Sequence, residues 1–210
     1  TGSPAEIAAA LRGMAKMRIH QEDWERAGAL YAEALEVGRA SGDRQAVAWA
    51  LAGLGEVARY RGDLATASIH LEEGLRVCRE IDSKPGIAYL LQAAGHVARY
   101  RGDLDLARER YRESLRLLHE MGNRRRIGIC LLGIAALDVR EGNFERAGLL
   151  YGVVQPMREP LGIRIAAVDR GEFERGMAEA RARLDEAEIE RVLAAGRALE
   201  LDAAVALALG

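Results

Sequence analysis

The stretch VARYRGDL occurs at residues 57–64 and again, letter for letter, at residues 97–104. The same forty-residue register places HQEDW at 20–24, YRGDL at 60–64 and 100–104, and REGNF at 140–144. A second series of segments rich in helix-breaking residues keeps this register: SGD at 41–43, IDSKPG at 81–86, GNRRR at 122–126 and PLGIR at 160–164. Each period therefore contains two breaks and two expected helices.

The RGDL segment has the composition of a tight turn between two antiparallel helices. A residue with a short side-chain oxygen stands directly before each expected second helix, at Asp23, Asp63, Asp103 and Asn143. Such a side chain accepts hydrogen bonds from the first free backbone N–H groups of a helix, so these residues are predicted N-caps. Glycine precedes three of them, at Gly62, Gly102 and Gly142, where the chain needs a residue that tolerates positive φ.

Between the breaks, apolar residues recur three or four positions apart, which is the spacing of amphipathic helices. Val47, Leu51, Leu54 and Ala58 show this pattern in one expected helix. One position in the second helix of each pair always carries a small side chain: Ala27, Ala67, Ala107 and Ala147. A small side chain there allows two helices to cross closely. The sequence therefore predicts an all-α fold.

These residues carry a family resemblance. Gly-Asp-Leu at the turn, and Ala followed four residues later by an aromatic or large apolar residue, resemble the tetratricopeptide repeat (TPR), whose common form has about 34 residues. The longer period resembles the TPR-like superhelix of MalT-like bacterial regulators. The tail, from ERAGLLYG at 145–152 onward, resembles the helical region of LuxR-type transcription regulators that carry a STAND-class ATPase.

The resemblance implies a right-handed TPR-like superhelix, an α-solenoid of four helix pairs. The pairs are expected within residues 1–164, at 5–42, 45–82, 86–122 and 126–161. Terminal repeats of a solenoid need their open core covered. Residues 165–210 are therefore expected to form a helical C-terminal cap, with helices near 167–184 and 186–198. Their apolar stripes run through Phe173, Met177, Ile189, Val192 and Leu193.

The first helix of each pair lines the concave face of a solenoid, which is the default binding surface. The resemblance to TPR domains places nine candidate binding residues there: Trp49, Glu56, Arg59, Tyr60, Tyr89, Gln92, His96, Arg99 and Tyr100. The arginines would bind carboxylates and the aromatic side chains would supply rigid contact area. Alternatively, the arginines pair with acids such as Glu56, and the aromatic side chains pack between repeats. Specificity is expected where the copies differ, at Glu56 against His96 and at Ala52 against Gln92.

Composition and motifs argue against several other functions. The 30 basic and 32 acidic residues nearly balance, so no overall field draws the chain to nucleic acid or to an anionic membrane. The arginines of NRRR at 123–126 are better explained as a solvated turn than as a nucleic-acid patch. The histidines are dispersed and no nucleophile or phosphate-binding motif occurs, so we expect no metal, no cofactor and no enzyme activity.

Cys78 and Cys130 lie in apolar helical surroundings without CxxC spacing, which predicts free thiols and favours a reducing cytoplasm. The sequence contains neither a membrane span nor a signal peptide. The opening TGSP resembles a cloning scar or a domain boundary, so an excised piece of a longer protein is expected.

The sequence thus favours a non-catalytic regulatory module of a bacterial multidomain transcription regulator. The expected partner is a protein or peptide, such as the ATPase domain of the same chain, or a small effector. The alternative is a stand-alone TPR scaffold or adaptor that binds a peptide segment in its concave groove. Pairing of two copies through the exposed first repeat is a further expectation.

Overall fold

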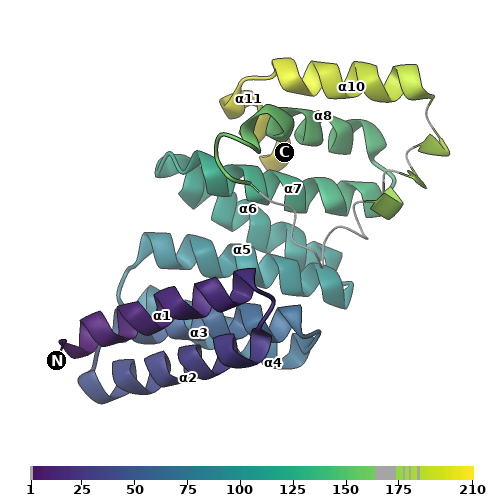
Figure 1. Ribbon diagram of the computed structural model, residues 1–210. Coiled ribbons are helices and arrows are strands. Elements are labelled where there is room, and N and C mark those ends of the chain that lie inside the picture. The colour runs from purple at the N-terminus through teal and green to yellow at the C-terminus, as the bar shows by residue number, and fades with distance from the viewer. Residues whose placement is uncertain (1, 164–173, 177, 180, 184) are drawn as a thin grey trace. The chain divides into compact units, whose positions relative to one another are not determined.

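A computed structural model describes residues 2–163, 174–176, 178–179, 181–183 and 185–210. Within these residues the chain forms helices in consecutive pairs, and no strand occurs among them (Figure 1). The prediction of an all-α protein is therefore confirmed. The chain divides into two compact units, Thr1–Asp103 and Leu104–Gly210, and each unit is described by itself.

The first unit contains α1 (Pro4–His20), α2 (Trp24–Ser41), α3 (Arg44–Tyr60), α4 (Leu64–Glu80) and α5 (Lys84–Arg101). Each helix packs against the next one along the chain. The first helices of successive pairs also touch, since α3 contacts both α1 and α5. This arrangement brings the predicted binding residues of α3 beside those of α5.

The second unit contains α6 (Leu104–Glu120), α7 (Arg124–Arg140), α8 (Phe144–Val154), the short 3-10 helix η1 (Gln155–Met157), α10 (Glu186–Ala198) and α11 (Leu201–Leu209). The helix expected at 186–198 is confirmed as α10, which lies along α8 (Figure 1). Helix α11 was not expected from the sequence, and it contacts α6, α7 and α8. Much of the helix expected near 167–184, including Phe173 and Met177, falls outside the described residues.

The turns follow a strict twenty-residue period. A residue with positive φ stands at every twentieth position from 22 to 162: Glu22, Gly42, Gly62, Asp82, Gly102, Gly122, Gly142 and Gly162. The positive φ expected at Gly62, Gly102 and Gly142 is confirmed. In the first RGDL turn, Gly62 N donates to Arg59 O at 3.0 Å and Asp63 N donates to Ala58 O at 2.9 Å. The links within pairs and between pairs thus share one geometry.

The predicted N-caps are confirmed at Asp23 and Asp63. Asp23 Oδ1 accepts from Arg26 N at 3.2 Å, and Asp63 Oδ1 accepts from Thr66 N at 3.0 Å. Asn143 occupies the N-cap position of α8 as predicted, but its side chain does not make the expected capping hydrogen bond. The Asn143 amide Nδ2 instead donates to Glu141 Oε2 at 3.3 Å.

A tyrosine on the second helix of one pair packs onto a glycine on the first helix of the next. A Cβ atom on Gly53 of α3 would lie 2.2 Å from the Tyr31 ring of α2, and one on Gly133 of α7 would lie 2.6 Å from the Tyr111 ring of α6. Both tyrosine side chains are almost fully buried. These two helix contacts therefore depend on the absence of a side chain at the glycine. We call each contact a tyrosine–glycine joint.

Helices α8 and α10 approach even more closely, backbone to backbone. A Cβ atom on Gly196 of α10 would lie 2.3 Å from Leu149 O, and one on Gly152 of α8 would lie 2.4 Å from Leu193 O. Ile189 and Val192 of the expected apolar stripe are buried, while Leu193 is half-buried. Helix α10 thus covers one side of α8. The boundary at residue 165 between repeats and cap remains a prediction.

Both cysteines are free and buried, as the sequence indicates. Within the described ranges, the helices all lack the combination of length and apolar character that a membrane span requires.

Candidate interaction site

The nine predicted binding residues lie on two adjacent helices of the first unit. Helix α3 carries four of them and α5 carries five. None is exposed: Arg59, Gln92 and Arg99 are 6%, 3% and 2% exposed, and the other six are half-buried. A partner that docks here would therefore touch mainly the half-buried side chains.

An aromatic pair joins the N-terminal halves of the two helices. Trp49 of α3 and Tyr89 of α5 meet edge to face, with ring centroids 5.3 Å apart and ring planes at 61°. This geometry is favourable because the positive edge of one ring meets the negative face of the other. The two predicted residues thus contact each other across the repeats.

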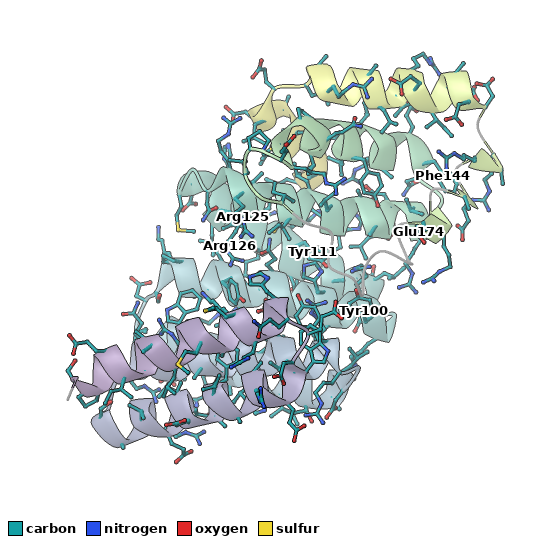
Figure 2. All side chains as sticks on the ribbon, in the orientation of Figure 1. Tyr100, Tyr111, Arg125, Arg126, Phe144 and Glu174 are labelled. Carbon is teal, nitrogen blue, oxygen red and sulfur yellow. The ribbon has the colours of Figure 1, made fainter. Side chains whose placement is uncertain are left out.

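A second group forms at the C-terminal ends of α3 and α5, and we call it the arginine–aromatic row: Trp24, Arg59, Tyr60, Arg99 and Tyr100. The Arg59 guanidinium carbon lies 4.3 Å from the Tyr60 ring centroid and 6.0 Å from that of Tyr100. Arg99 lies 4.6 Å from the ring centroid of Tyr100, and Figure 2 labels Tyr100 at the end of α5. Both cations are therefore within the range of cation–π attraction to tyrosine rings.

Trp24, the first residue of α2, extends this row, and the sequence did not single it out. Its ring stacks on Tyr60 with centroids 4.6 Å apart and planes at 15°. The available signal was its register, since Leu64, Leu104 and Phe144 occupy the same position in the other repeats. Both ring–ring contacts found among the described residues, Trp24–Tyr60 and Trp49–Tyr89, therefore involve residues that the sequence predicted for binding.

Glu56 adds a negative charge beside the tyrosine–glycine joint. Burial raises the pKa of Tyr31, the charge of Glu56 raises it further, and Arg12 lowers it. His96 stands at the position of α5 that corresponds to Glu56 in the forty-residue register. The aromatic side chains do pack between repeats, as the alternative to a binding role proposes, because their rings contact one another. The rings of Trp49, Tyr60, Tyr89 and Tyr100 are nevertheless only half-buried, so part of their surface can still contact a partner.

A buried ionic cluster in the second unit was missed by the sequence reasoning. Asp138 of α7 is fully buried, with Arg108 Nη2 of α6 at 3.0 Å and Arg146 Nε of α8 at 3.5 Å. Arg108 also reaches Glu141 at 2.7 Å. Desolvation raises the pKa of Asp138, while the charges of Arg146 and Arg108 act in the opposite direction. The signal was a break in register, since Ala58 and Ala98 occupy this position in earlier repeats.

Arg146 of this cluster and Arg112 of α6 also bind helix α11. Arg112 Nε and Arg146 Nη2 both donate to Ala208 O, at 3.4 Å and 3.2 Å. The C-terminal end of a helix carries partial negative charge, so it attracts these cations. Burial lowers the pKa of Arg112, and the positive charges of Arg108, Arg146 and Arg116 lower it further. The cluster therefore binds a part of its own chain.

The NRRR segment begins α7. Asn123 Oδ1 caps the helix by accepting from Arg126 N at 3.2 Å, and Arg124 and Arg125 are exposed (Figure 2 labels Arg125 and Arg126). These exposures agree with the solvated turn expected there. Among the described residues, no group of three or more His, Cys, Asp or Glu side chains is placed to hold a metal ion.

Comparison with known proteins places the first unit in context. Residues 6–80, which span α1 to α4, match the family model of the tetratricopeptide repeat. This region is TPR-like. Together with the consecutive helix pairs, the match confirms the predicted fold class, a TPR-like α-solenoid. No curated protein matches the chain. TPR repeats generally mediate interactions between proteins, and much of the arginine–aromatic row lies within the TPR-like region.

Proposed function

We propose that this chain is a non-catalytic interaction module that binds a protein or peptide segment across α3 and α5. The arginine–aromatic row and the Trp49–Tyr89 pair form the binding surface. Six of the predicted residues keep part of their surface open: Trp49, Glu56, Tyr60, Tyr89, His96 and Tyr100. The buried arginines act as positioning residues, which hold the tyrosine rings in place.

The observation that carries this proposal is the placement of both arginines on tyrosine faces. A guanidinium on an aromatic face fixes the ring and places positive charge behind it. Rigid aromatic side chains lose little conformational entropy when a partner binds, so they are effective interface residues. Such a surface suits a segment that has its own aromatic or apolar anchors and acidic side chains.

The finer proposal is that the module serves a bacterial multidomain transcription regulator of the LuxR type. The resemblance of the tail and of the forty-residue period supports this context. The occupant would be an effector, a peptide or the ATPase domain of the same protein. Binding would regulate the ATPase only if the occupant has different affinities for its resting and active states.

A swap between the two register-equivalent positions tests the binding surface. The double variant Glu56→His/His96→Glu keeps the composition and net charge but exchanges the charged side chains of the two repeats on the proposed binding surface. The wild-type chain and the variant would each be used to select binders from one peptide library, and the selected peptides would be titrated against both by calorimetry.

We expect the two proteins to select different peptides, with each set bound more weakly by the other protein. The swap Arg61→Glu/Glu72→Arg, at positions outside the nine predicted residues, is the matched control and should leave the selection unchanged. Melting temperatures of both variants establish that the fold is intact. Selection of the same peptides by wild type and the Glu56/His96 variant would refute binding at this surface.

A further inference from the structure

Helix α11 is held by polar contacts at both of its ends. At its first turn, Asp202 Oδ1 lies 2.9 Å from His119 Nε2 of α6. At its last turn, Ala208 O accepts from Arg112 Nε of α6 at 3.4 Å and from Arg146 Nη2 of α8 at 3.2 Å. The first pair is exposed, and exposed ion pairs contribute little to stability. The two arginines are therefore the stronger polar attachment of α11.

The apolar attachment of α11 is small. Its buried side chains are Ala204, Val205 and Ala208, and its three leucines are half-buried. Leu199 and Glu200, which join α11 to α10, have an extended backbone. A helix of nine residues is marginal on its own, and segments with few buried apolar contacts open before the whole domain unfolds. We therefore expect α11 to separate from α6 and α8 while the other helices stay folded.

The arginines that hold α11 belong to a cluster with an excess of positive charge. The guanidinium groups are those of Arg108, Arg112 and Arg146, whereas the carboxylates that the described residues place among them are Asp138 and Glu141. Burial, followed by the charges of Arg108 and Arg146, lowers the pKa of Arg112. Because the charged form of Arg112 is disfavoured here, an additional negative charge beside it would be stabilising.

Ala208 O is a weak acceptor for two arginines. It is a single backbone oxygen without a full charge, and both guanidinium groups share it. A phosphate or carboxylate group has a full charge and at least two oxygens, so it forms shorter and stronger hydrogen bonds with arginine. Since Arg112 and Arg146 reach the same oxygen, one small anion can contact both side chains.

The arginine pair is not a part of the repeating framework. Residues that pack the solenoid recur every forty positions, as the turn glycines do. The pairs at the positions that correspond to Arg112 and Arg146 in the earlier repeats are Ala32 with Thr66 and Glu72 with Leu106. Neither pair contains an arginine. The two cations thus belong to this place in the chain alone, which favours a local role over a role in packing the repeats.

We propose that Arg112 and Arg146 form an oxyanion-binding site and that α11 is a latch that covers it. An anion with a phosphate or carboxylate group binds the two arginines in place of Ala208 O, and α11 is then released from α6 and α8. Because the anion binds only the released state, it shifts the equilibrium toward that state. The site lies in the second unit, so it does not depend on the surface proposed across α3 and α5.

Hydrogen exchange of the full chain, followed by mass spectrometry, tests this proposal with inorganic phosphate and acetate as probes. Both are added at constant pH, and sodium chloride keeps the ionic strength equal, so general screening is the same in every sample. Exchange of the α11 amides reports the released population. This population, and with it the exchange rate, should rise about tenfold when the anion is at ten times its dissociation constant. Amides of α6, α8 and α10 should keep their protection.

The two probes distinguish the chemical source of the oxyanion. Acceleration by phosphate alone assigns the site to phosphate groups, and acceleration by acetate alone assigns it to carboxylates. Either result supports an oxyanion site beneath α11. Equal exchange of α11 in phosphate, acetate and sodium chloride would overturn the proposal. Exchange of α11 at the same rate as α10 in every sample would also overturn it, because α11 would then not be a separate latch.

Variants of single arginines locate the binding. Arg112→Gln removes one guanidinium and leaves the ion pairs of Asp138 in place. In this variant α11 should exchange faster without any probe, and the probes should have no more effect than sodium chloride. Arg125→Gln removes an exposed arginine of α7 and is the matched control, which should respond as wild type does.

Melting temperatures establish that each variant is folded. Should Arg112→Gln melt much earlier than wild type, Arg112→Lys replaces it, because lysine keeps the charge but lacks the planar fork that binds two oxygens. The response to the probes should then still be weaker than in wild type. Equal acceleration in wild type and in the folded Arg112 variant would place the anion elsewhere and would overturn the proposal.

Discussion

The tyrosine–glycine joint predicts that one methyl group has opposite effects at two equivalent positions. Gly53→Ala places a Cβ atom 2.2–2.4 Å from three carbons of the Tyr31 ring, well inside any real contact. Tyr31 is only 2% exposed, so its ring has no free space to enter. Gly13→Ala adds the same methyl group at the same register, where nothing lies within 4 Å.

Two terms set the magnitudes. Replacing glycine by alanine inside a helix stabilises it by about 1 kcal/mol, and this gain applies at both positions. Overpacking a core costs about 1–3 kcal/mol, and this cost applies only at Gly53. We therefore expect Gly13→Ala to stabilise the chain by about 1 kcal/mol and Gly53→Ala to destabilise it by up to about 2 kcal/mol. Each kcal/mol shifts the melting temperature by about 2–4 °C in a chain of this size.

Other repeats of the chain suggest a second substitution that should compensate for Gly53→Ala. The positions of Tyr31 and Gly53 are filled by Leu71 and Ala93 one repeat later, and by Tyr111 and Gly133 one repeat after that. The larger side chain, tyrosine, thus occurs together with glycine, and the smaller one, leucine, occurs together with alanine. The double variant Tyr31→Leu/Gly53→Ala should recover most of the stability that Gly53→Ala loses. Urea unfolding followed by circular dichroism measures all four proteins, and equal midpoints for Gly53→Ala and Gly13→Ala would refute the reasoning.

Four further predictions concern other parts of the chain. Asp138→Ala leaves Arg108 and Arg146 without their buried carboxylate and should cost about 3–5 kcal/mol in urea unfolding, so a loss below 1 kcal/mol would contradict the cluster's role. The Thr66 hydrogen bonds lower the pKa of Asp63 below 3.8. The free energy of unfolding that wild type gains over Asp63→Asn should therefore be fully present above this pH and disappear as the pH falls further. A difference in unfolding free energy that does not change with pH would contradict this prediction. Burial raises the pKa of Cys78 to about 11, so iodoacetamide should modify it at pH 8 only after denaturant is added, and rapid native labelling would show the packing to be wrong. Deleting residues 165–210 removes α10 from α8 and should lower both melting temperature and solubility, whereas unchanged values would reject the cap.

The sequence predicted the turns and helices well because their physical signals are local. Glycine at 62, 102 and 142 permits positive φ, and the residue after it caps the next helix, as Asp63 does. The same reasoning found the turns at HQEDW and IDSKPG but did not predict that Glu22 and Asp82 adopt positive φ in them, because neither residue is glycine. Helix α11 also gave no signal, since LDAAVALAL is short and lacks a polar stripe from which periodicity can be recognised.

The candidate site was predictable only in part, because contacts depend on which helices meet. Register placed Arg59 and Tyr60 beside Arg99 and Tyr100, but the stacking of Trp24 on Tyr60 depends on how α2 follows its turn. The ion pairs of the buried Asp138 with Arg108 of α6 and Arg146 of α8 depend on the packing of three helices. The sequence showed only an aspartate at a position where two earlier repeats have alanine. The role of the nine residues in binding a partner remains a prediction.

The tyrosine–glycine joint also restricts how this chain can gain or lose repeats. Removing residues 44–83, one full period, would join α2 to α5 and bring Tyr31 to face Ala93, which is the overpacked combination. Removing two periods, residues 44–123, would bring Tyr31 to face Gly133, and the sizes would match again. Although the turns repeat every twenty residues and the helix pairs every forty, the exchangeable unit is a set of two pairs. Gene duplication or protein engineering that respects this larger unit should yield folded arrays, while exchange of single pairs should require compensating changes at the joint.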